Sequence, residues 1–471
     1  MLSLGALPKP SARRIAIHVT PAAERALRAG HPWVFDRAIR SQSHEGRPGD
    51  LAVVFDAKRR FLAIGLYDPT SPIRVRVLQA REPATIDRAW FAARLRAAAD
   101  IRRPLTLTGP RLPAVDTAAR ITGGVAPAST DGCRLVHGEN DGLPGLIVDR
   151  YAATLVLKLY SAAWLPYLAD ILAGLEGLLP FERIVLRYSR NLDALMVPHG
   201  FSDGQVLAGP ALDGPVVFQE NGLRFAADLA HGHKTGFFFD QRENREQVYQ
   251  LAAGRRVLDL FAYSGGFSVY AAAGGAASVT SVDISAPALE AAAANFALNR
   301  DVIRESHVST IGQRGPEHTG SAAGAHNLSE IARRGAADEV SAAAGDVKHT
   351  LIAADVFDAL EEFTSSGQSF DMVIVDPPSF AKSAAEVEGA LAAYARLARL
   401  ATGVLVPGGI LVIASCSSRV SADAFFDTVT QAAQQAGRPL RELLRTGHAL
   451  DHPITFPEGA YLKCLFASVP G

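Results

Sequence analysis

Four apolar segments in the second half of the chain alternate with alanine-rich stretches, and this alternation constrains the fold more than any other feature. The segments are 255–261 (RRVLDLF), 278–284 (SVTSVDI), 371–377 (DMVIVDP) and 409–415 (GILVIAS). Near-continuous apolar runs of this kind are typical of parallel strands that are buried on both faces. The pattern therefore predicts an α/β fold with a doubly wound, mostly parallel sheet.

The rest of the chain divides into two further regions. Residues 12–82 contain short strand-like runs separated by turns, which predicts a small β-rich domain. Residues 83–215 begin with helical spacing over 86–103 and continue with a mixed pattern, so we expect a helical linker, an insertion and a central α+β domain. The α/β domain then covers residues 216–471.

Two polar stretches interrupt this organisation. Residues 104–130 are rich in Pro, Gly, Thr and Ala, which indicates a linker or a surface insertion. Residues 301–349 have no sustained apolar period. A loop of this length inside a domain is usually either functional or disordered, and we expect disorder here and no active-site residue.

Charge and cysteine content narrow the class of protein. The formal net charge of the 471 residues is −1, but residues 1–103 hold 19 Lys and Arg against 9 Asp and Glu. A basic module of this kind suits a polyanion such as RNA, although a solvated arginine-rich surface explains it equally well. No apolar run reaches the roughly 18–20 residues that span a bilayer, and no signal peptide is evident. Three scattered cysteines form neither a disulfide framework nor a zinc site, so we expect a cytoplasmic protein without a metal.

A nucleotide site is predicted where the first apolar strand ends. The strand carries Asp259, and a glycine-containing turn at 261–267 (FAYSGGF) follows it. Glycines at this turn let a ligand approach the backbone, and Asp283 at the end of the next strand can accept hydrogen bonds from ribose hydroxyls. The turn lacks the G-x-G-x-x-G pattern of dinucleotide sites, so an adenosine ligand without a pyrophosphate fits better. Asp355 could contact the adenine amino group, or it could simply cap a helix.

A polar and aromatic run at 231–245 (HGHKTGFFFDQRENR) precedes the first strand of the sheet. Its polar side chains beside three consecutive Phe suit a wall of the cofactor pocket, whereas the simpler interpretation is a β-hairpin that leads into a capped helix. His231 and His233 have no convincing third metal ligand.

The chemical site is predicted at the ends of the last two apolar strands. Asp376 and two prolines follow one strand, and Cys416 ends the next. Ligands of open α/β sheets bind at the carboxyl ends of strands, so we expect the carboxylate and the thiol to face each other across a cleft. A thiolate that adds to C6 of cytosine makes C5 nucleophilic enough to attack a methyl donor. The alternative for Cys416 is a small buried residue, which is how Cys133 and Cys464 are interpreted.

The sequence resembles the bacterial 23S rRNA cytosine-C5 methyltransferases that carry an N-terminal PUA domain. The matching stretches are 31–35 (HPWVF), 135–151 (LVHGENDGLPGLIVDRY), 233–245 and 257–269 (VLDLFAYSGGFSV), together with the Asp-Pro-Pro-Ser-Phe and Ser-Cys-Ser elements. The resemblance implies a PUA domain, a central domain and a Rossmann-like class I methyltransferase domain. It also implies S-adenosylmethionine as donor and a cytosine of 23S rRNA as acceptor.

The resemblance also implies roles for single residues. Cys416 matches the nucleophile, Asp376 the acid beside it, Asp283 the ribose-binding acid and Asp355 the adenine-binding acid. The complete set of expected cofactor contacts is Lys234, Thr235, Phe239, Asp240, Arg242, Asp259, Phe261, Tyr263, Ser264, Gly265, Asp283, Asp355, Asp376 and Pro377. The expected RNA contacts are Trp33, Arg74, Arg76 and Lys382. Two departures are the insertions at 104–130 and 301–349 and the absence of a cysteine after Asp376-Pro-Pro.

Three other functions remain open from the sequence. An RNA methyltransferase that acts on a base nitrogen, such as guanine N7 or an exocyclic amine, would not need the thiol. A non-catalytic RNA-binding assembly factor would not need the cofactor. A nicotinamide dehydrogenase is disfavoured by the missing glycine pattern and by the Asp-Pro-Pro turn. The expected partner is RNA, specifically 23S rRNA or a large-subunit precursor. No membrane partner is expected, and the sequence is compatible with a homodimer.

Overall fold

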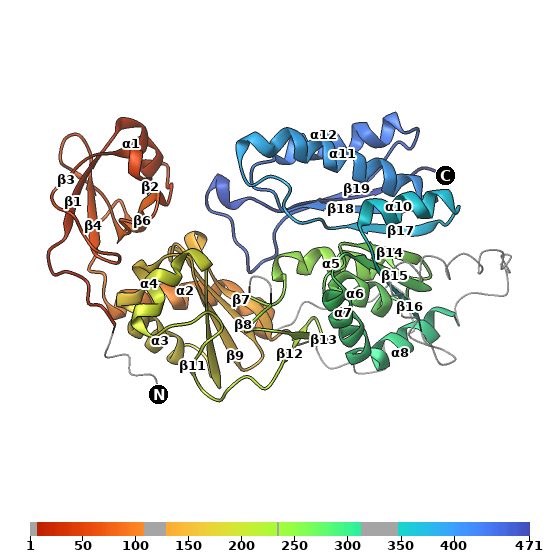
Figure 1. The fold of residues 1–471 in the computed structure, drawn as a ribbon, viewed down its shortest axis with the longest axis horizontal. Coiled ribbons are helices and arrows are strands. Elements are labelled where there is room, and N and C mark those ends of the chain that lie inside the picture. Colours follow the sequence, from red (N-terminus) through yellow and green to blue (C-terminus); the bar gives the residue numbers. More distant parts are fainter. Residues whose placement is uncertain (1–6, 108–128, 233–234, 312–346) are drawn as a thin grey trace.

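The computed structural model describes residues 7–107, 129–232, 235–311 and 347–471. Within these ranges the chain forms three sheets of five or more strands and one two-stranded hairpin, arranged along the chain from red to blue in Figure 1. No helix in the described ranges has the length and apolarity to cross a membrane.

The N-terminal sheet has six strands in the order β2-β6-β5-β4-β1-β3. Its strands alternate buried and more exposed side chains, as β1 and β4 show, because only one face of the sheet covers the core. The elements are β1 (Ile15–Val19), α1 (Pro21–Arg28), β2 (Trp33–Phe35), β3 (Ile39–Gln42), β4 (Leu51–Phe55), β5 (Phe61–Tyr67) and β6 (Ile73–Ala80).

The central sheet has five strands in the order β11-β10-β9-β8-β7, and it packs against α2. The sequence predicts a helix over 86–103, whereas α2 extends from Arg88 to Leu107 and includes Pro104. The other elements are β7 (Gly132–His137), β8 (Leu146–Tyr151), β9 (Thr154–Leu159), α3 (Leu168–Glu176), β10 (Arg183–Tyr188), α4 (Asp193–Met196) and β11 (Val206–Ala208).

A hairpin connects the central sheet to the C-terminal region. Strands β12 (Val216–Glu220) and β13 (Leu223–Ala227) meet at Asn221 and Gly222, which both have positive φ. An Asn-Gly pair is favoured in such two-residue turns because both residues tolerate the left-handed conformation. The chain then passes through 235–241 into α5 (Arg242–Leu251).

The C-terminal sheet has seven strands in the order β16-β15-β14-β17-β18-β20-β19, and it confirms the predicted doubly wound fold. All pairs from β16 to β18 are parallel, and β20 and β19 add antiparallel strands at one edge. In Figure 1, α11 and α12 cover one face, and α5, α6 and α7 cover the other. The elements are β14 (Arg256–Leu260), α6 (Gly266–Ala273), β15 (Ser278–Asp283), α7 (Ala286–Leu298), α8 (Arg300–Ile311), β16 (Lys348–Ala353), α10 (Val356–Ser365), β17 (Phe370–Val375), α11 (Val387–Gly403), β18 (Leu405–Ser415), α12 (Ala422–Gln435), β19 (Arg441–Thr446) and β20 (Lys463–Ser468).

The prediction of disorder over 301–349 is wrong at both ends of that stretch. Residues 301–311 continue α8, where Ile303 is buried against the core. His349 lies in β16, hydrogen-bonds to the hydroxyl of Ser281 at 2.8 Å and stacks on Phe296. Burial lowers the pKa of His349 to about 3, so it packs as a neutral ring. Residues 312–346, like residues 108–128 of the other predicted insertion, lie outside the described residues.

Candidate active site

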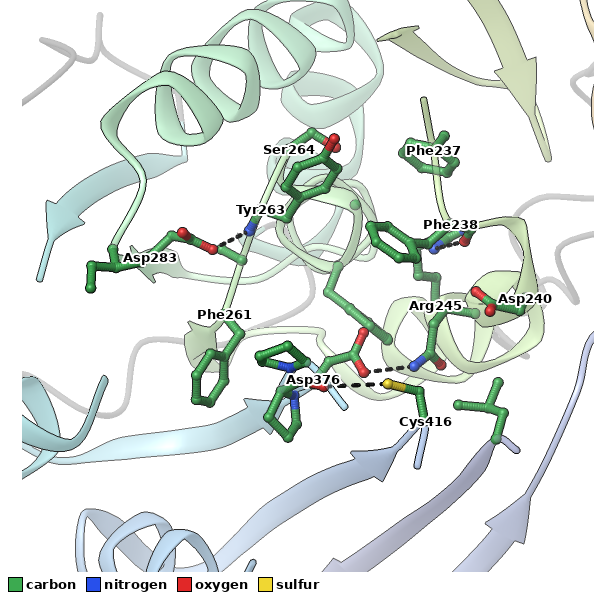
Figure 2. A pocket seen from close by; sticks show the side chains of 18 residues that line it. Phe237, Phe238, Asp240, Arg245, Phe261, Tyr263, Ser264, Asp283, Asp376 and Cys416 are labelled. Atoms are coloured by element: carbon green, nitrogen blue, oxygen red, sulfur yellow. Dashed lines mark hydrogen bonds between the residues drawn. The ribbon is translucent and has the colours of Figure 1, made fainter. Parts of the chain in front are cut away.

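Loops at the carboxyl ends of β14, β15, β17 and β18 converge on a cavity of about 360 Å³ (Figure 2). This edge of a parallel sheet is where the sequence places the site. Eight of the predicted residues line the cavity: Asp240, Phe261, Tyr263, Ser264, Asp283, Asp376, Pro377 and Cys416. Ten other residues complete the lining: Phe237, Phe238, Gln241, Arg245, Ala262, Gly266, Phe267, Ile284, Pro378 and Leu462.

The turn after β14 holds two side chains in an uncommon backbone conformation. Phe261 and Tyr263 have φ values of 60° and 49° although neither is glycine. Strain of this kind, of the order of 1 kcal/mol or more for each residue, tends to be kept where it positions a functional group. Gly265 has φ 75°, and a Cβ there would lie 2.8 Å from the Cβ of Ala292. Gly265 therefore lets the turn pack on α7, and it does not itself line the cavity.

Asp283 stands at the end of β15 with both carboxylate oxygens held by backbone donors. The N–H of Tyr263 donates to one oxygen at 2.9 Å, and the N–H of Ser285 donates to the other at 2.8 Å. The next residue, Ile284, is 76% exposed and lines the same cavity. A fixed carboxylate beside an exposed apolar side chain fits a ribose and the flat adenine attached to it.

Asp259 lies behind the turn and does not line the cavity. Its side chain is buried, and the hydroxyl of Ser268 donates to it at 2.6 Å. Burial raises the pKa of Asp259 to about 7. Asp259 therefore bonds to α6 behind the turn, while Asp283 presents its carboxylate to the cavity.

Three other predicted cofactor residues hold the surrounding structure together. Arg242 is fully buried and pairs with Asp451 at 2.7 Å and with Glu220 at 3.4 Å. The hydroxyl of Thr235 donates to Asp149 at 2.6 Å, and Phe239 packs in an aromatic cluster. None of the three lines the first cavity, and Lys234 lies outside the described residues.

Asp355 caps a helix. Its side chain accepts from the backbone N–H groups of Phe357, at 2.8 Å, and Asp358 at the start of α10. This is the simpler of the two interpretations of Asp355 from the sequence. The residue is exposed and does not line the cavity as bounded here.

The wall opposite the turn comes from the Phe-rich run, as predicted. The guanidinium group of Arg245 lies 4.7 Å from the ring centre of Phe237 and donates to the carbonyl oxygen of Phe238 at 2.9 Å. Arg245 also pairs with the buried Glu220 at 2.6 Å. This ion pair fixes the Phe side chains that face the turn in Figure 2, where Phe238 packs edge-on against Tyr263.

Cys416 and Asp376 both line the cavity and lie near each other in Figure 2. The thiol of Cys416 donates to the carbonyl oxygen of Pro377, with 3.7 Å between the sulfur and the oxygen. The side-chain amide of Gln241 donates to Asp376 at 2.8 Å. Cys133 and Cys464 are fully buried, and burial raises the pKa of Cys133 to about 12. Cys416 is the half-buried cysteine of the three, so it is the one a reactant can reach.

A buried lysine supports the loop that carries Cys416. Lys463 in β20 donates to the carbonyl oxygens of Ser417 and Val420 at 2.5 and 2.7 Å. Burial lowers the pKa of Lys463 to about 8. Nothing in the sequence pattern around Lys463 indicated this role, because its partners are main-chain atoms of a distant loop. Gln241 was missed for a similar reason, since only the folded chain brings it to Asp376.

A second cavity, of about 530 Å³, adjoins the first. Both are lined by Phe237, Phe238, Asp240 and Cys416. Of the four predicted RNA contacts, Trp33 and Arg76 line this second cavity. Arg74 instead donates to backbone carbonyls of its own turn, and the exposed Lys382 lies on a loop outside both cavities. Among the residues that the structure describes, no group of three or more His, Cys, Asp and Glu could hold a metal ion.

Two protein families match parts of this chain, and two solved structures share its fold. Residues 17–80 match the PUA-like domain family, and residues 191–316 match the S-adenosylmethionine-dependent methyltransferase family. A SAM-dependent methyltransferase from Streptococcus mutans has the same fold, with a TM-score of 0.71 at 19% identity over 96% of this chain and 100% of that one. A methyltransferase complexed with SAH matches equally well, with a TM-score of 0.71 at 19% identity over 97% of this chain and 100% of that one.

Curated relatives are more similar and match along nearly the whole chain. A ribosomal RNA large subunit methyltransferase of Deinococcus radiodurans is 46% identical over 98% of both chains. A ribosomal RNA large subunit methyltransferase I of Shewanella denitrificans is 34% identical over 97% of this chain and 99% of its own. With its PUA-like domain and its doubly wound sheet, the chain belongs to the S-adenosylmethionine-dependent ribosomal RNA large subunit methyltransferase family.

Proposed function

We propose that this enzyme methylates C5 of a cytosine in 23S rRNA through a covalent adduct with Cys416. We assign the first cavity, the one lined by Asp283 and Tyr263, to the methyl donor and call it the donor cavity. One observation carries the proposal: Cys416 lines both the donor cavity and the second cavity, beside the Asp-Pro-Pro turn. A thiol at this boundary can contact an acceptor base while the methyl donor occupies the other side. The names of the relatives support large-subunit ribosomal RNA as the acceptor, and the enzyme would encounter that RNA in the cytoplasm.

In the proposed reaction, Cys416 first loses its thiol proton to solvent, and the resulting thiolate forms a bond from sulfur to C6 of cytosine. The electron pair of the C5–C6 double bond then becomes available at C5. When bound, S-adenosylmethionine supplies an electrophilic methyl group to C5 and leaves as S-adenosylhomocysteine. A base next removes the C5 proton, the double bond re-forms, and the bond from sulfur to C6 breaks to restore the thiolate.

Asp376 orients the base in this scheme. Its carboxylate accepts a hydrogen bond from Gln241, and a carboxylate oxygen can also accept from the exocyclic amine of cytosine. That contact distinguishes cytosine from uracil, which offers an acceptor at the same position. The two prolines after Asp376 fix the turn, so the carboxylate keeps its place while the adduct forms and breaks.

Asp240 is the group that we assign to the C5 proton. It is the ionisable residue besides Cys416 that lines both cavities. The hydroxyl of Tyr461 donates to one of its oxygens at 2.8 Å and holds the carboxylate in place. A carboxylate at the boundary can take the proton from the adduct, which the chain needs because no cysteine follows Asp376-Pro-Pro.

In this proposal the donor is held by the turn after β14 and by the acid at the end of β15. Asp283 would hold the ribose hydroxyls, Ile284 would pack on the adenine, and Phe238 and Tyr263 would close the sides. The side chain of Asp355 already accepts two hydrogen bonds from the start of α10. It would contact the adenine amino group only through its remaining oxygen lone pairs. Trp33, Arg74 and Arg76 of the PUA-like domain would contact the RNA.

The test is a comparison of rRNA from cells with and without this gene. Nucleoside mass spectrometry of 23S rRNA should show one fewer 5-methylcytosine in the deletion strain, restored by the wild-type gene and not by Cys416→Ala. The variant should still bind S-adenosylmethionine in vitro, since Cys416 contributes only one wall of that cavity. Restoration of the methyl mark by Cys416→Ala would rule out the covalent mechanism and favour methylation of a base nitrogen.

A further inference from the structure

A buried lysine contacts the residues on both sides of Cys416 in the chain. Lys463, the first residue of β20, pairs with Ser415, the last residue of β18, in the antiparallel ladder between these strands. Its ammonium group donates to the carbonyl oxygen of Ser417 at 2.5 Å. Lys463 is only 4% exposed, so little solvent screens its charge from the cysteine that lies between these two serines.

Three main-chain oxygens hold the ammonium group in one position. Besides Ser417, Lys463 donates to the carbonyl oxygens of Val420 at 2.7 Å and Tyr461 at 3.2 Å. The N–H of Val420 also donates to the carbonyl oxygen of Ser417, which closes a turn directly after Cys416. An ammonium group has three N–H donors and a neutral amine has two, so this set of acceptors suits the charged lysine.

The charge of this lysine is not balanced by a carboxylate. The arginines that line the two cavities, Arg76, Arg134 and Arg245, each pair with an Asp or a Glu. Lys463 forms no such ion pair within the part of the chain that the structure describes. Burial lowers the pKa of Lys463 to about 8, and the charge of Cys416 acts against burial. Because a buried cation without an anion is costly, an anion that forms beside it is stabilised.

The carboxylates near the thiol oppose its ionisation. Asp240 and Asp376 line the donor cavity together with Cys416, and two negative groups disfavour a third. Arg419 follows Cys416 on the same loop, but it is exposed, so solvent screens its charge. The buried ammonium group of Lys463 is therefore the cation on this side of the cavity that can offset the two carboxylates.

The neighbouring rings add no unpaired charge. Burial lowers the pKa of His448 to about 4, so its ring is neutral near pH 7. Burial raises the pKa of both Tyr394 and Tyr461, which are neutral as well. His452, on the wall of the second cavity, pairs with Asp451 at 2.9 Å.

We propose that Lys463 is a positioning residue whose ammonium group stabilises the thiolate of Cys416 and outweighs the two carboxylates. Its hydrogen bond to Ser417 fixes the main chain next to the sulfur, and its charge favours the anion that must form before sulfur bonds to C6. The thiol proton leaves to solvent, so Lys463 keeps its own proton and is not the base. This inference rests on the proposed function and adds how the nucleophile is activated.

The pH dependence of Cys416 alkylation tests this inference on the full-length enzyme without RNA. Iodoacetamide reacts with the thiolate, so the rate rises with pH and its midpoint reports the pKa of the thiol. Cys133 and Cys464 are fully buried, and the rate measured in Cys416→Ala corrects for any reaction at these two residues. Wild-type enzyme should give a midpoint below about 8.5, the usual value for a cysteine.

Three variants separate the charge of the lysine from its hydrogen bonds. Lys463→Gln keeps an amide donor and removes the charge, so the midpoint should rise by about one pH unit or more. Lys463→Arg keeps the charge and should stay close to wild type. Arg419→Gln is the matched control, because it removes an exposed positive charge from the same loop and should leave the midpoint unchanged.

The alkylation midpoints decide the role of Lys463. An unchanged midpoint in Lys463→Gln, with a lower melting temperature, would mean that Lys463 only supports the fold and would overturn the inference. An equal rise in Lys463→Arg and Lys463→Gln would also overturn it, since the charge differs between them. A wild-type midpoint at or above about 8.5 would do the same even if Lys463→Gln failed to fold.

Failure of the proposed reaction would look different. If Cys416→Ala restored the methyl mark in 23S rRNA, the covalent mechanism would be wrong, whatever the alkylation midpoints. A midpoint that rises in Lys463→Gln would still show that the lysine stabilises the thiolate. Unchanged S-adenosylmethionine binding by the variants confirms that they are folded.

Discussion

The side-chain amide of Gln241 donates a 2.8 Å hydrogen bond to the carboxylate of Asp376. The amide oxygen of Gln241 accepts from Asn244, and the side chain of Asn244 accepts in turn from Thr446. These bonds fix which end of the Gln241 amide points to Asp376. A chain of three polar side chains therefore determines the position of a carboxylate that we assign to the acceptor base.

Replacement of Gln241 should separate turnover from donor binding. Gln241→Leu leaves Asp376 without its donor, so we expect kcat to fall about tenfold to a hundredfold, which corresponds to the loss of one hydrogen bond to a charged group. The KM for S-adenosylmethionine should change little. Gln435→Leu, at the exposed end of α12, is the control. Equal losses in kcat and in donor affinity would mean that Gln241 only supports the fold.

Asp240→Asn should trap the reaction after methyl transfer. The amide cannot accept the C5 proton, so the bond from sulfur to C6 persists. We expect a protein–RNA complex that survives denaturing electrophoresis and contains the labelled methyl group. The complex should vanish in the double variant that also carries Cys416→Ala. Normal release of 5-methylcytosine by Asp240→Asn would assign the proton to another group.

Asp283→Ala should weaken donor binding more than a substitution of Asp355, the residue that caps α10. Asp283 offers two fixed oxygens to the ribose, and loss of hydrogen bonds to a charged group costs about 1.5–3 kcal/mol. The dissociation constant measured by calorimetry should therefore rise about tenfold or more. Asp423→Ala, in the exposed first turn of α12, should leave it unchanged. Wild-type affinity in Asp283→Ala would place the ribose elsewhere.

The pKa of Asp259 predicts an unusual pH dependence of stability. Burial raises this pKa from 3.8 to about 7, so the folded state favours the protonated form. The stabilisation is complete below about pH 4 and is lost as the pH rises through about 7. Asp259→Asn should therefore raise the melting temperature at about pH 8 more than at about pH 5, by roughly 2–4 °C for each kcal/mol gained.

Asp371 on β17 provides the opposite case for comparison. Burial disfavours its charged form, but hydrogen bonds and the charge of Arg256 outweigh burial and lower the pKa of Asp371. Asp371→Asn should lower the melting temperature at neutral pH and have less effect in acid. If both variants shifted in the same direction at every pH, the assigned charge states would be incorrect.

The strand-end residues of the candidate site could be predicted because sheet topology places them. Asp283 ends an apolar strand, Asp376 and Cys416 each follow one, and parallel strands bring their carboxyl ends to one edge. Arg242 and Thr235 lie in the polar run next to the site, but their side chains turn to Asp451 and Asp149. Proximity in sequence does not reveal which way a side chain points.

The contacts that sequence reasoning missed join segments far apart in the chain. Lys463 bonds to main-chain carbonyls near Cys416, and Gln241 reaches Asp376 across 135 residues. Neither leaves a periodic or compositional signal. The ends of the stretch 301–349 were mispredicted because Ile303 and His349 are buried side chains whose immediate chain neighbours are more exposed, and a pattern search needs repeated apolar positions.

The bond from Trp33 to Glu139 and the contact of Trp33 with Phe456 have a consequence for how such enzymes diversify. When a flexible linker joins an RNA-binding domain to an enzyme, that domain can be exchanged for another, and only the choice of RNA target changes. Here the N-terminal domain contributes residues to the wall of the second cavity itself, which also contains Cys416. A chimaera with a foreign N-terminal module should hold RNA and S-adenosylmethionine and still turn over slowly, so recognition and chemistry in this chain would have to evolve together.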